Sequence, residues 1–403
     1  MQKINGGVTA PQGFKAAGIH CGIRKNKSKK DIALILSEYP AAAAAVYTQN
    51  LVKGAPLTVT KNNLQNGSAR AMICNSGNAN TCNADGIEIA EKMCALAAAQ
   101  CGVEASDIIV ASTGVIGQPL DITPIAEGMP ALASALSYDG ESAAEAIMTT
   151  DTVKKEIAVE FELGGKVCRI GGIAKGSGMI HPNMATMLVF LTTDAAISAE
   201  MLHKAISEDV KDTFNMISVD GDTSTNDMLS IMANGQCGNE EITAEGEDFD
   251  VFKKALNMVT DDLCRKIAAD GEGATRLLEC SVSGAATKED ARRIAKSVVC
   301  SSLFKSAMFG ADANWGRALC AIGYSGANVD INKVDLDFAS AAGTIALCRD
   351  GAGVPFSEEE AKKILSEKEI NIIIKLGDGE ASAIARGCDL TYEYVKINGD
   401  YRS

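Results

Sequence analysis

The sequence predicts a chain in which strands and helices alternate, the pattern of an α/β or α+β protein. Short apolar runs of strand length recur between longer segments with helical periodicity. The residues are 46% apolar, and 403 of them are enough for substantial cores in two or three domains. No internal repeat and no low-complexity linker interrupts the alternation.

The first half supplies most of the predicted strands. Apolar, β-branched runs predict strands over residues 31–36, 71–74, 108–111, 157–163 and 167–173. Helical periodicity predicts helices over residues 87–100, ended by Gly102, and over residues 124–136. The basic residues between 24 and 30 are expected at a solvated hairpin tip.

The second half carries clearer helix signals. Apolar residues at spacings of three and four predict an amphipathic helix over residues 249–267. Capping boxes that begin at Thr287 and Ser357 open two more helices. Strands are predicted over residues 370–375 and 390–397.

Composition and charge exclude several classes of function. The chain has 38 Lys+Arg against 52 Asp+Glu, a formal net charge of −14, which argues against nucleic acid or an anionic membrane as partner. Only 4% of the residues are aromatic, so stacking platforms for bases or sugars are scarce. An anionic small substrate would need a locally positive pocket.

The cysteines indicate a reducing compartment. There are 13, with no Cys-x-x-Cys pair and no Cys/His spacing that fits zinc, so no metal is expected. The first residues lack the apolar core of a signal peptide, and no segment approaches a membrane span of about 20 apolar residues. A cytoplasmic protein with reduced, mostly buried thiols is expected.

A glycine-rich turn that leads to a threonine is the strongest chemical signal. Lys175 and three residues of the pattern Gly-Ser-Gly precede Ala185 and Thr186, and Thr186 opens a short apolar run. A threonine inside a chain has no base of its own. Cleavage of the Ala185–Thr186 bond would give Thr186 a free α-amine that can act as that base.

Other constellations are weaker. The chain has three histidines, none in a nucleophile-elbow motif; His203 is expected on a helix surface, and His181 is open to a structural or a catalytic role. The polar run over residues 220–227 is interpreted either as a hydroxyl-rich turn or as support beneath an active site. Thr113 and Gly114 follow a strand, where they form either a plain turn or a hydroxyl and N–H pair that stabilises an oxyanion.

Taken together, these motifs resemble the ornithine acetyltransferase family, the glutamate/ornithine N-acetyltransferases of arginine biosynthesis. The resemblance runs in order along essentially the whole chain. The segments that carry it are residues 11–14, 74–80, 112–117, 148–152, 175–188, 219–227, 270–275, 310–317 and 387–391.

The resemblance implies a set of functional residues. Cleavage would fall between Ala185 and Thr186, giving an α chain of residues 1–185 and a β chain of residues 186–403 with Thr186 as nucleophile. Thr113 and Gly114 match the oxyanion pair. The substrate contacts match Thr149 or Thr150, Lys175, Thr186, Glu272, Asn398 and the terminal Ser403.

It also implies a fold and a reaction. The expected fold is a layered α/β sandwich of two stacked sheets covered by helices, of the N-terminal-nucleophile type. The expected enzyme moves the acetyl group of N2-acetylornithine to glutamate, without metal or organic cofactor, as a heterotetramer of two α and two β chains. Acetyl-CoA as a further donor, which would make the enzyme bifunctional, stays open.

The end of the chain departs from the family pattern. Ala385-Arg386 stand where relatives often carry a tryptophan, and the chain ends in Ser403 instead of a threonine, which puts acceptor preference in doubt. The alternative class is an N-terminal-nucleophile amidohydrolase or aminopeptidase with water as acceptor. A non-enzymatic binding protein is a third interpretation, which self-cleavage would exclude.

Overall fold

The computed structural model describes residues 1–181 and 187–399. The chain divides into two compact units, which we describe separately. Unit 1 consists of Met1–Gly176, Pro182–Phe214 and Thr223–Leu263. Unit 2 consists of Ser177–His181, Asn215–Asp222 and Cys264–Ser403.

Unit 1 is built on one mixed sheet in the order β1-β6-β7-β8-β10-β3-β4-β5, with β2 paired to β3. Its strands are β1 (Gln2–Ile4), β2 (Phe14–Ile19), β3 (Ile32–Tyr47), β4 (Ser68–Asn78), β5 (Ile108–Val115), β6 (Lys155–Leu163), β7 (Lys166–Lys175), β8 (Leu188–Thr193) and β10 (Met228–Ala233). Its helices are α1 (Ala55–Asn63), α2 (Gly86–Cys101), α3 (Thr123–Ser134), α4 (Glu141–Ala146) and α5 (Ala199–Asp209). Most of α6 (Glu247–Ala269) also belongs to unit 1.

The long strand β3 folds this sheet into two layers. Its first half pairs with β2 and β4, whereas residues 42–47 pair with β10. The register shifts between Leu36 and Ala41, around Pro40, which has no N–H to donate. One apolar cluster then joins the inner face of β3, β4 and β5 to that of β7, β8 and β10, including Ile35, Met72 and Phe190. The two sheet layers are therefore stacked, as predicted.

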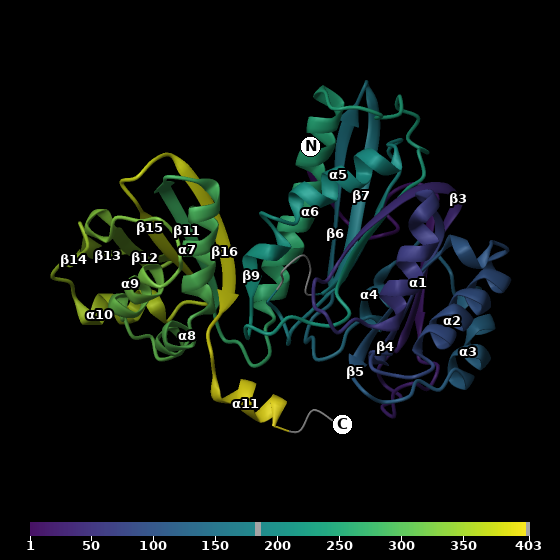
Figure 1. The fold of residues 1–403 in the computed structure, drawn as a ribbon, viewed down its shortest axis with the longest axis horizontal. Helices are drawn as coiled ribbons and strands as arrows, with labels where there is room; N and C mark the ends of the chain where they lie inside the picture. Colours follow the sequence, from purple (N-terminus) through teal and green to yellow (C-terminus); the bar gives the residue numbers. More distant parts are fainter. Residues whose placement is uncertain (182–186, 400–403) are drawn as a thin grey trace. The chain divides into compact units, whose positions relative to one another are not determined.

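Helices cover both outer faces of these layers. A second apolar cluster packs α2 and α3 against the other face of β3, β4 and β5, and Figure 1 shows α1, α2 and α3 together on this side. On the opposite side α6 packs on β6, where the rings of Phe161 and Phe252 lie 6.2 Å apart. Unit 1 is thus an αββα sandwich, and this confirms the predicted fold class.

Unit 2 contains a mixed sheet in the order β14-β13-β12-β15-β11-β16-β9. Its strands are β9 (Ile217–Ser218), β11 (Leu277–Ala285), β12 (Asp335–Ser340), β13 (Gly343–Arg349), β14 (Ala352–Gly353), β15 (Glu369–Lys375) and β16 (Ala381–Cys388). Its helices are α7 (Lys288–Cys300), α8 (Ser302–Phe309), α9 (Trp315–Gly323), α10 (Glu358–Leu365) and α11 (Tyr392–Asn398). One core packs helices α7 to α10 on this sheet.

Local signals predicted most elements well. Gly102 ends α2 in the left-handed conformation, with φ +67°. Thr287 and Ser357 accept hydrogen bonds from the N–H groups of Asp290 and Glu360 and so cap α7 and α10. The predicted hairpin tip is the exposed connection between the antiparallel strands β2 and β3.

The predicted strand over residues 390–397 is wrong, because that segment forms helix α11. Strand β16 ends before it, where the Asp389 carboxylate accepts the N–H groups of Thr275 and Arg276 at 2.8 and 3.0 Å. Glu393 in the first turn and Lys396 in the last turn suit the helix dipole. The aromatic and β-branched residues of this segment are typical of a strand. In the described part of the chain, however, the segment pairs with no other strand.

The predicted chain boundary at residues 185 and 186 does not coincide with a boundary between the compact units. Strand β8 begins at Leu188 and lies inside the sheet of unit 1, between β7 and β10. None of the described helices combines the length and the apolar character needed to cross a membrane.

Candidate functional site

The carboxyl ends of β4 and β5 bring two predicted site residues to one edge of unit 1. The two strands are parallel, with Ser76 opposite Thr113 and Gly77 opposite Gly114. Thr113 and Gly114 are half-buried at the end of β5. Ligand contacts commonly lie at such carboxyl ends of neighbouring parallel strands.

Glycine is the only residue type that position 114 accommodates. The φ angle of Gly114 is +134°, and a Cβ atom there would lie 2.3 Å from the carbonyl carbon of Gly77 and 2.5 Å from the nitrogen of Asn78. A side chain would therefore clash with backbone, which cannot move aside as a flexible side chain can. The strand ends approach each other this closely because position 114 has no side chain.

Asn226 supports the strand end from below. Its Nδ2 donates to the carbonyl oxygens of Ala79 and Ser112 at 2.6 and 3.0 Å, and its Oδ1 accepts the Thr81 hydroxyl at 2.6 Å. Ser112 directly precedes Thr113. Residues 223–227 therefore support this edge of unit 1, and Asn226 also forms a local turn through its N–H and the Ser224 hydroxyl.

Lys175 lies beside Thr113. It ends β7, is only 7% exposed, and its Nζ lies 3.5 Å from the Thr113 Oγ1. The next residue, Gly176, donates its N–H to Asp151 at 2.8 Å. Unit 1 thus places an ammonium group next to the hydroxyl that the sequence predicted for an oxyanion site.

Asp151 connects this lysine to the predicted Thr149–Thr150 segment. The N–H of Thr149 donates to the second carboxylate oxygen of Asp151 at 2.9 Å. Asp151 also forms an ion pair with Lys155 at 2.6 Å, and both side chains are fully buried. Burial alone would raise the pKa of the Asp151 carboxyl, but the ammonium groups of Lys155 and Lys175 hold this pKa well below its usual value.

Asp227 is a second buried carboxyl group, and sequence reasoning did not single it out. It is 3% exposed, and its Oδ2 has no hydrogen-bond partner among the described residues. Complete burial raises its pKa well above the usual value, although the charge of Lys175 and a bond from Ser224 act the other way. Asp227 immediately precedes β10, whose first residue, Met228, donates its N–H to the carbonyl of Met187.

Unit 2 brings two further predicted residues together. Asn398, on α11, donates from Nδ2 to the Glu272 carboxylate at 2.7 Å and to the Tyr394 carbonyl at 3.1 Å. The Glu272 side chain is buried, and its N–H donates to the Ser177 carbonyl at 3.0 Å. A Cβ at Gly178 would lie 2.3 Å from the carboxyl carbon of Glu272, so glycine is needed there for this approach.

Asp220 holds the end of the glycine-rich turn within unit 2. Its carboxylate accepts the N–H groups of Met179 and Ile180 at 2.6 and 2.9 Å and the Tyr394 hydroxyl at 3.3 Å. The polar run over residues 220–227 therefore has two functions. Residues 220–222 shape the glycine turn in unit 2, and residues 223–227 support the strand end in unit 1.

The histidines take structural positions. His203 is exposed on α5, as predicted. The His181 Nδ1 lies 3.1 Å from the Ser218 hydroxyl and 3.4 Å from the Cys300 sulfur. Burial, followed by the charge of Lys296, lowers the pKa of His181 to about 4. An imidazole with this pKa is a weak base, and its contacts with Ser218 and Cys300 favour the structural interpretation.

The predicted site residues therefore fall into two described groups. Unit 1 brings together Thr113, Gly114 and Lys175, with Thr149 linked to them through Asp151 and with Thr150 half-buried in the same bend. Unit 2 pairs Glu272 with Asn398. The predictions for Ala185, Thr186 and Ser403 lie outside the described residues.

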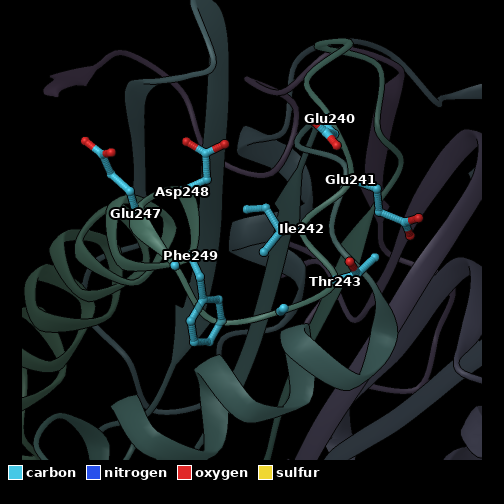
Figure 2. A pocket seen from close by; sticks show the side chains of 9 residues that line it. Glu240, Glu241, Ile242, Thr243, Glu247, Asp248 and Phe249 are labelled. Carbon is cyan, nitrogen blue, oxygen red and sulfur yellow. The ribbon is translucent and has the colours of Figure 1, made fainter.

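A hollow of about 370 Å³ at the start of α6 contains none of these residues. Figure 2 shows carboxylate side chains around its Ile242 and Phe249, those of Glu240, Glu241, Glu247 and Asp248. Four carboxylates make this hollow unsuitable for the anionic substrates that the resemblance implies.

Comparisons with known proteins agree with the order of the motifs. The sequence model of the ArgJ family matches residues 15–403. The arginine biosynthesis bifunctional protein ArgJ of Symbiobacterium thermophilum is 51% identical over 406 residues, which cover 100% of both chains. The protein of the same name from Bacillus subtilis is 48% identical over 403 residues, or 100% of this chain and 98% of its own. The crystal structure of the Bacillus halodurans protein matches with a TM-score of 0.50 and 47% identity, over 52% of this chain and 97% of that chain.

Proposed function

The chain belongs to the ArgJ family, and on this premise we propose that it moves an acetyl group from N2-acetylornithine to glutamate through an ester on Thr186. It is an acetyl-transfer enzyme of arginine biosynthesis, a glutamate N-acetyltransferase. The proposal concerns its route: self-cleavage at Ala185–Thr186, a covalent acetyl-enzyme, and the residues that serve each step.

One observation carries the proposal: Thr113, Gly114 and Lys175 converge at the carboxyl ends of β5 and β7. A hydroxyl and a backbone N–H at one strand end can both donate to an oxygen that gains negative charge. The Lys175 ammonium, 3.5 Å from the Thr113 hydroxyl, adds positive potential to the same edge. This is the locally positive environment that a protein with a net charge of −14 needs to bind an anionic substrate.

The chemistry then proceeds in two transfers. The α-amine of Thr186 takes the proton of its own hydroxyl, and Oγ attacks the acetyl carbonyl of acetylornithine. The tetrahedral oxygen is held by the Thr113 hydroxyl and the Gly114 N–H. Ornithine leaves with the proton, and the amine of glutamate then attacks the acetyl ester, which returns the Thr186 hydroxyl and releases acetylglutamate.

The sheet of unit 1 explains how cleaved chains would stay together. Strand β8, which follows the proposed cleavage bond, pairs with β7 over six residue positions. Strand β10 pairs with β3 over six more. Strands β7 and β3 would belong to the α chain, and β8 and β10 to the β chain. A single scission would therefore leave both products within one hydrogen-bonded sheet.

Two charged side chains account for recognition of the amino acids. Lys175 offsets the α-carboxylate that acetylornithine and glutamate share. Glu272, oriented by Asn398, pairs with an ammonium group. A threonine of the Thr149–Thr150 pair and the terminal Ser403 complete the proposed contacts.

The remaining parts of the proposal are assembly, cofactors and location. We expect a cytoplasmic heterotetramer of two α and two β chains, and a transfer that uses no metal or organic cofactor. Acetyl-CoA is the proposed second donor, which would allow net synthesis of acetylglutamate. Formation of acetylglutamate from acetyl-CoA and glutamate alone tests this last point.

Self-cleavage is tested by comparing three proteins on a denaturing gel. The parent protein should give two bands with a new N-terminus at Thr186. Thr186→Ser keeps the hydroxyl and should still cleave, whereas the nearly isosteric Thr186→Val should give a single band. An active parent protein that remains one intact polypeptide would overturn the proposed nucleophile.

The molecule that accepts the acetyl group distinguishes the proposed transferase from the alternative, an amidohydrolase. Acetylornithine is supplied with and without glutamate, and both ornithine and acetylglutamate are measured. The transferase releases ornithine in quantity only when glutamate is present. Steady release of ornithine and acetate without glutamate would instead establish water as the acceptor.

The oxyanion pair is tested at two glycines. Gly114→Ala should lower kcat about 100- to 1,000-fold, because a Cβ displaces the strand end and with it one donor. Gly117→Ala is the control: Gly117 also has a positive φ, +76°, but a Cβ at this position would meet no atom within 4 Å. Equal losses in the two variants would show that backbone conformation, and not the donor, determines the rate.

A further inference from the structure

Unit 1 contains a second group of side chains with chemical potential, three residues that can bind a metal. Cys168 lies near the start of β7, Asp194 directly follows β8, and Cys237 lies in the loop after β10. Their two sulfur atoms and one carboxylate oxygen all lie within 4.8 Å of one another. Lys175 and the proposed chemistry belong to the opposite end of β7.

The carboxylate of Asp194 is fixed in orientation by the backbone. Its two oxygens accept the N–H groups of Arg169 at 2.6 Å and Gln12 at 2.9 Å, and its own carbonyl accepts the Cys237 N–H at 2.9 Å. Hydrogen bonds of this kind hold the carboxylate ligands of metals in place. A carboxylate oxygen that accepts one hydrogen bond keeps a lone pair for a cation.

Asp194 is also a buried charge whose nearest basic neighbour is engaged elsewhere. The residue is fully buried, and burial raises the pKa of its carboxyl. The guanidinium of Arg169 pairs with Glu160 at 3.2 Å. A cation at this point would compensate the buried charge, which the hydrogen bonds to two neutral amides do only in part.

The hydrogen bonds of Asp194 hold separate segments of the chain together, and this role explains why an aspartate is buried here. It does not explain the two thiols beside it. Cys168 is fully buried and Cys237 half-buried, so one side of the group faces solvent.

We propose that Cys168, Asp194 and Cys237 form a structural site for a thiophilic divalent cation of the zinc class. The two sulfurs and one carboxylate oxygen supply three ligands of a tetrahedron, and water completes it from the exposed side of Cys237. Zinc–sulfur bonds of about 2.3 Å place tetrahedral sulfur atoms about 3.8 Å apart, so the donors need only close slightly. Binding deprotonates both thiols and releases two protons.

The ion would fasten three separate segments at one end of the sheet. β7 would belong to the α chain, and the residues after β8 and β10 to the β chain. The site therefore adds a bond between chains at the end of the sheet opposite the reaction, where it should affect stability and not the transfer itself.

The test uses the full-length protein, stripped of metal with a chelator and titrated with Co²⁺ as a spectroscopic probe. One equivalent should give the charge-transfer absorption of cobalt–thiolate bonds, and Zn²⁺ should displace it and raise the melting temperature. Cys237→Ser should weaken binding at least about tenfold, since even loss of an outer partner of a ligand has that effect. Cys320→Ser, which changes an exposed cysteine of α9 in unit 2, is the control and should bind as the parent does.

Three results would overturn the proposal. These are no thiolate absorption at one equivalent, absorption that persists in the Cys168→Ser/Cys237→Ser double variant, and a Cys168–Cys237 disulfide formed in preference to metal binding. If Cys168→Ser fails to fold, the half-buried Cys237→Ser decides the matter alone. The melting temperature with and without Zn²⁺ gives a readout that does not depend on activity.

Discussion

Two buried aspartates of unit 1, Asp151 and Asp227, both interact electrostatically with Lys175. The pKa values of their carboxyl groups nevertheless shift in opposite directions. Asp151 has Lys155 at 2.6 Å and two backbone N–H donors, and its pKa is held well below the usual range. Asp227 is equally buried, one of its oxygens has no partner among the described residues, and its pKa is raised well above the usual value.

The contrast shows that the partner, and not burial, decides the charge of these groups. Both carboxyls lose water, which by itself favours the neutral acid. Among the described residues only Asp151 forms an ion pair, which together with its hydrogen bonds offsets this cost, whereas the bond from Ser224 does not offset it for Asp227. Two carboxyls whose pKa values shift in opposite directions next to one lysine are a common arrangement in sites that bind and move protons.

The largest loss of stability is expected for Asp151→Asn, which tests the contrast between the two aspartates. The substitution leaves the Lys155 ammonium buried without its counter-ion, and loss of one partner of a buried pair costs about 3–5 kcal/mol of unfolding free energy. The measurement is denaturation by urea at pH 7. The low folded pKa also means that the contribution of Asp151 is present above about pH 4 and is lost as acid protonates the group.

The control for this variant is Glu88→Gln, which breaks an exposed ion pair with Lys92 on α2. An exposed pair of this kind contributes little to stability, because water screens both charges. If Asp151→Asn lost no more stability than Glu88→Gln, the buried pair would not be what fixes the Thr149 segment, and the contrast with Asp227 would disappear.

The next test removes the charge that both aspartates share. Lys175→Met should raise the KM of acetylornithine and of glutamate about tenfold each, or about 1.4 kcal/mol of binding, because both substrates carry the α-carboxylate. It should also raise the pKa of Asp227 further, since the opposing charge is gone. Lys166→Met, at the exposed start of the same strand, should change neither quantity. A rise in KM for only one substrate would contradict a shared carboxylate site.

Sequence reasoning found the residues whose position depends on local rules. Parallel pairing of β4 and β5 brings Thr113 and Gly114 to one edge, and a strand followed by Thr-Gly is visible in the sequence. The support that Asn226 gives to the strand end was one of two interpretations of the polar run. Gly178, whose lack of a side chain leaves room for the Glu272 carboxylate, was visible as part of the Gly-Ser-Gly turn.

What sequence reasoning missed depends on contacts between distant segments. Nothing local shows that Asp227 is buried without a described partner for Oδ2, or that Asp151 lies beneath Gly176. Pro40 suggests a break, but β3 runs through it because its two halves pair with different strands. Metal ligands at short spacings are visible in a sequence, whereas Cys168, Asp194 and Cys237 meet only through the sheet.

A smaller effect is expected for Asp227→Asn, the same substitution as at Asp151. If Asp227 is neutral in the fold, the amide replaces the neutral acid at a change within about 1 kcal/mol at about pH 4, where the unfolded carboxyl only begins to ionise. The raised folded pKa also means that the parent loses stability as pH rises above about 4, where the unfolded carboxyl ionises first. Asp227→Asn should therefore flatten the stability profile between about pH 5 and pH 8, measured by urea denaturation. A loss of several kcal/mol in the variant would instead show an ionised, paired Asp227.

The last test extends the same rule to a base in unit 2. His181 is surrounded by Ser218, Cys300 and the charge of Lys296, and its pKa is lowered to about 4 although the charge of Asp220 acts the other way. Below about pH 6.5 the imidazole binds a proton in the unfolded state but stays neutral in the folded state. The parent protein should therefore lose stability between about pH 6.5 and pH 4. Because His181 is partly exposed, solvent reduces this contribution to roughly 1–2 kcal/mol.

His181→Gln should remove this part of the loss of stability in acid, whereas His203→Gln on the surface of α5 should not. If His181→Gln left the acid profile unchanged, the imidazole would already be protonated in the fold, and burial would not be sufficient to keep this group neutral.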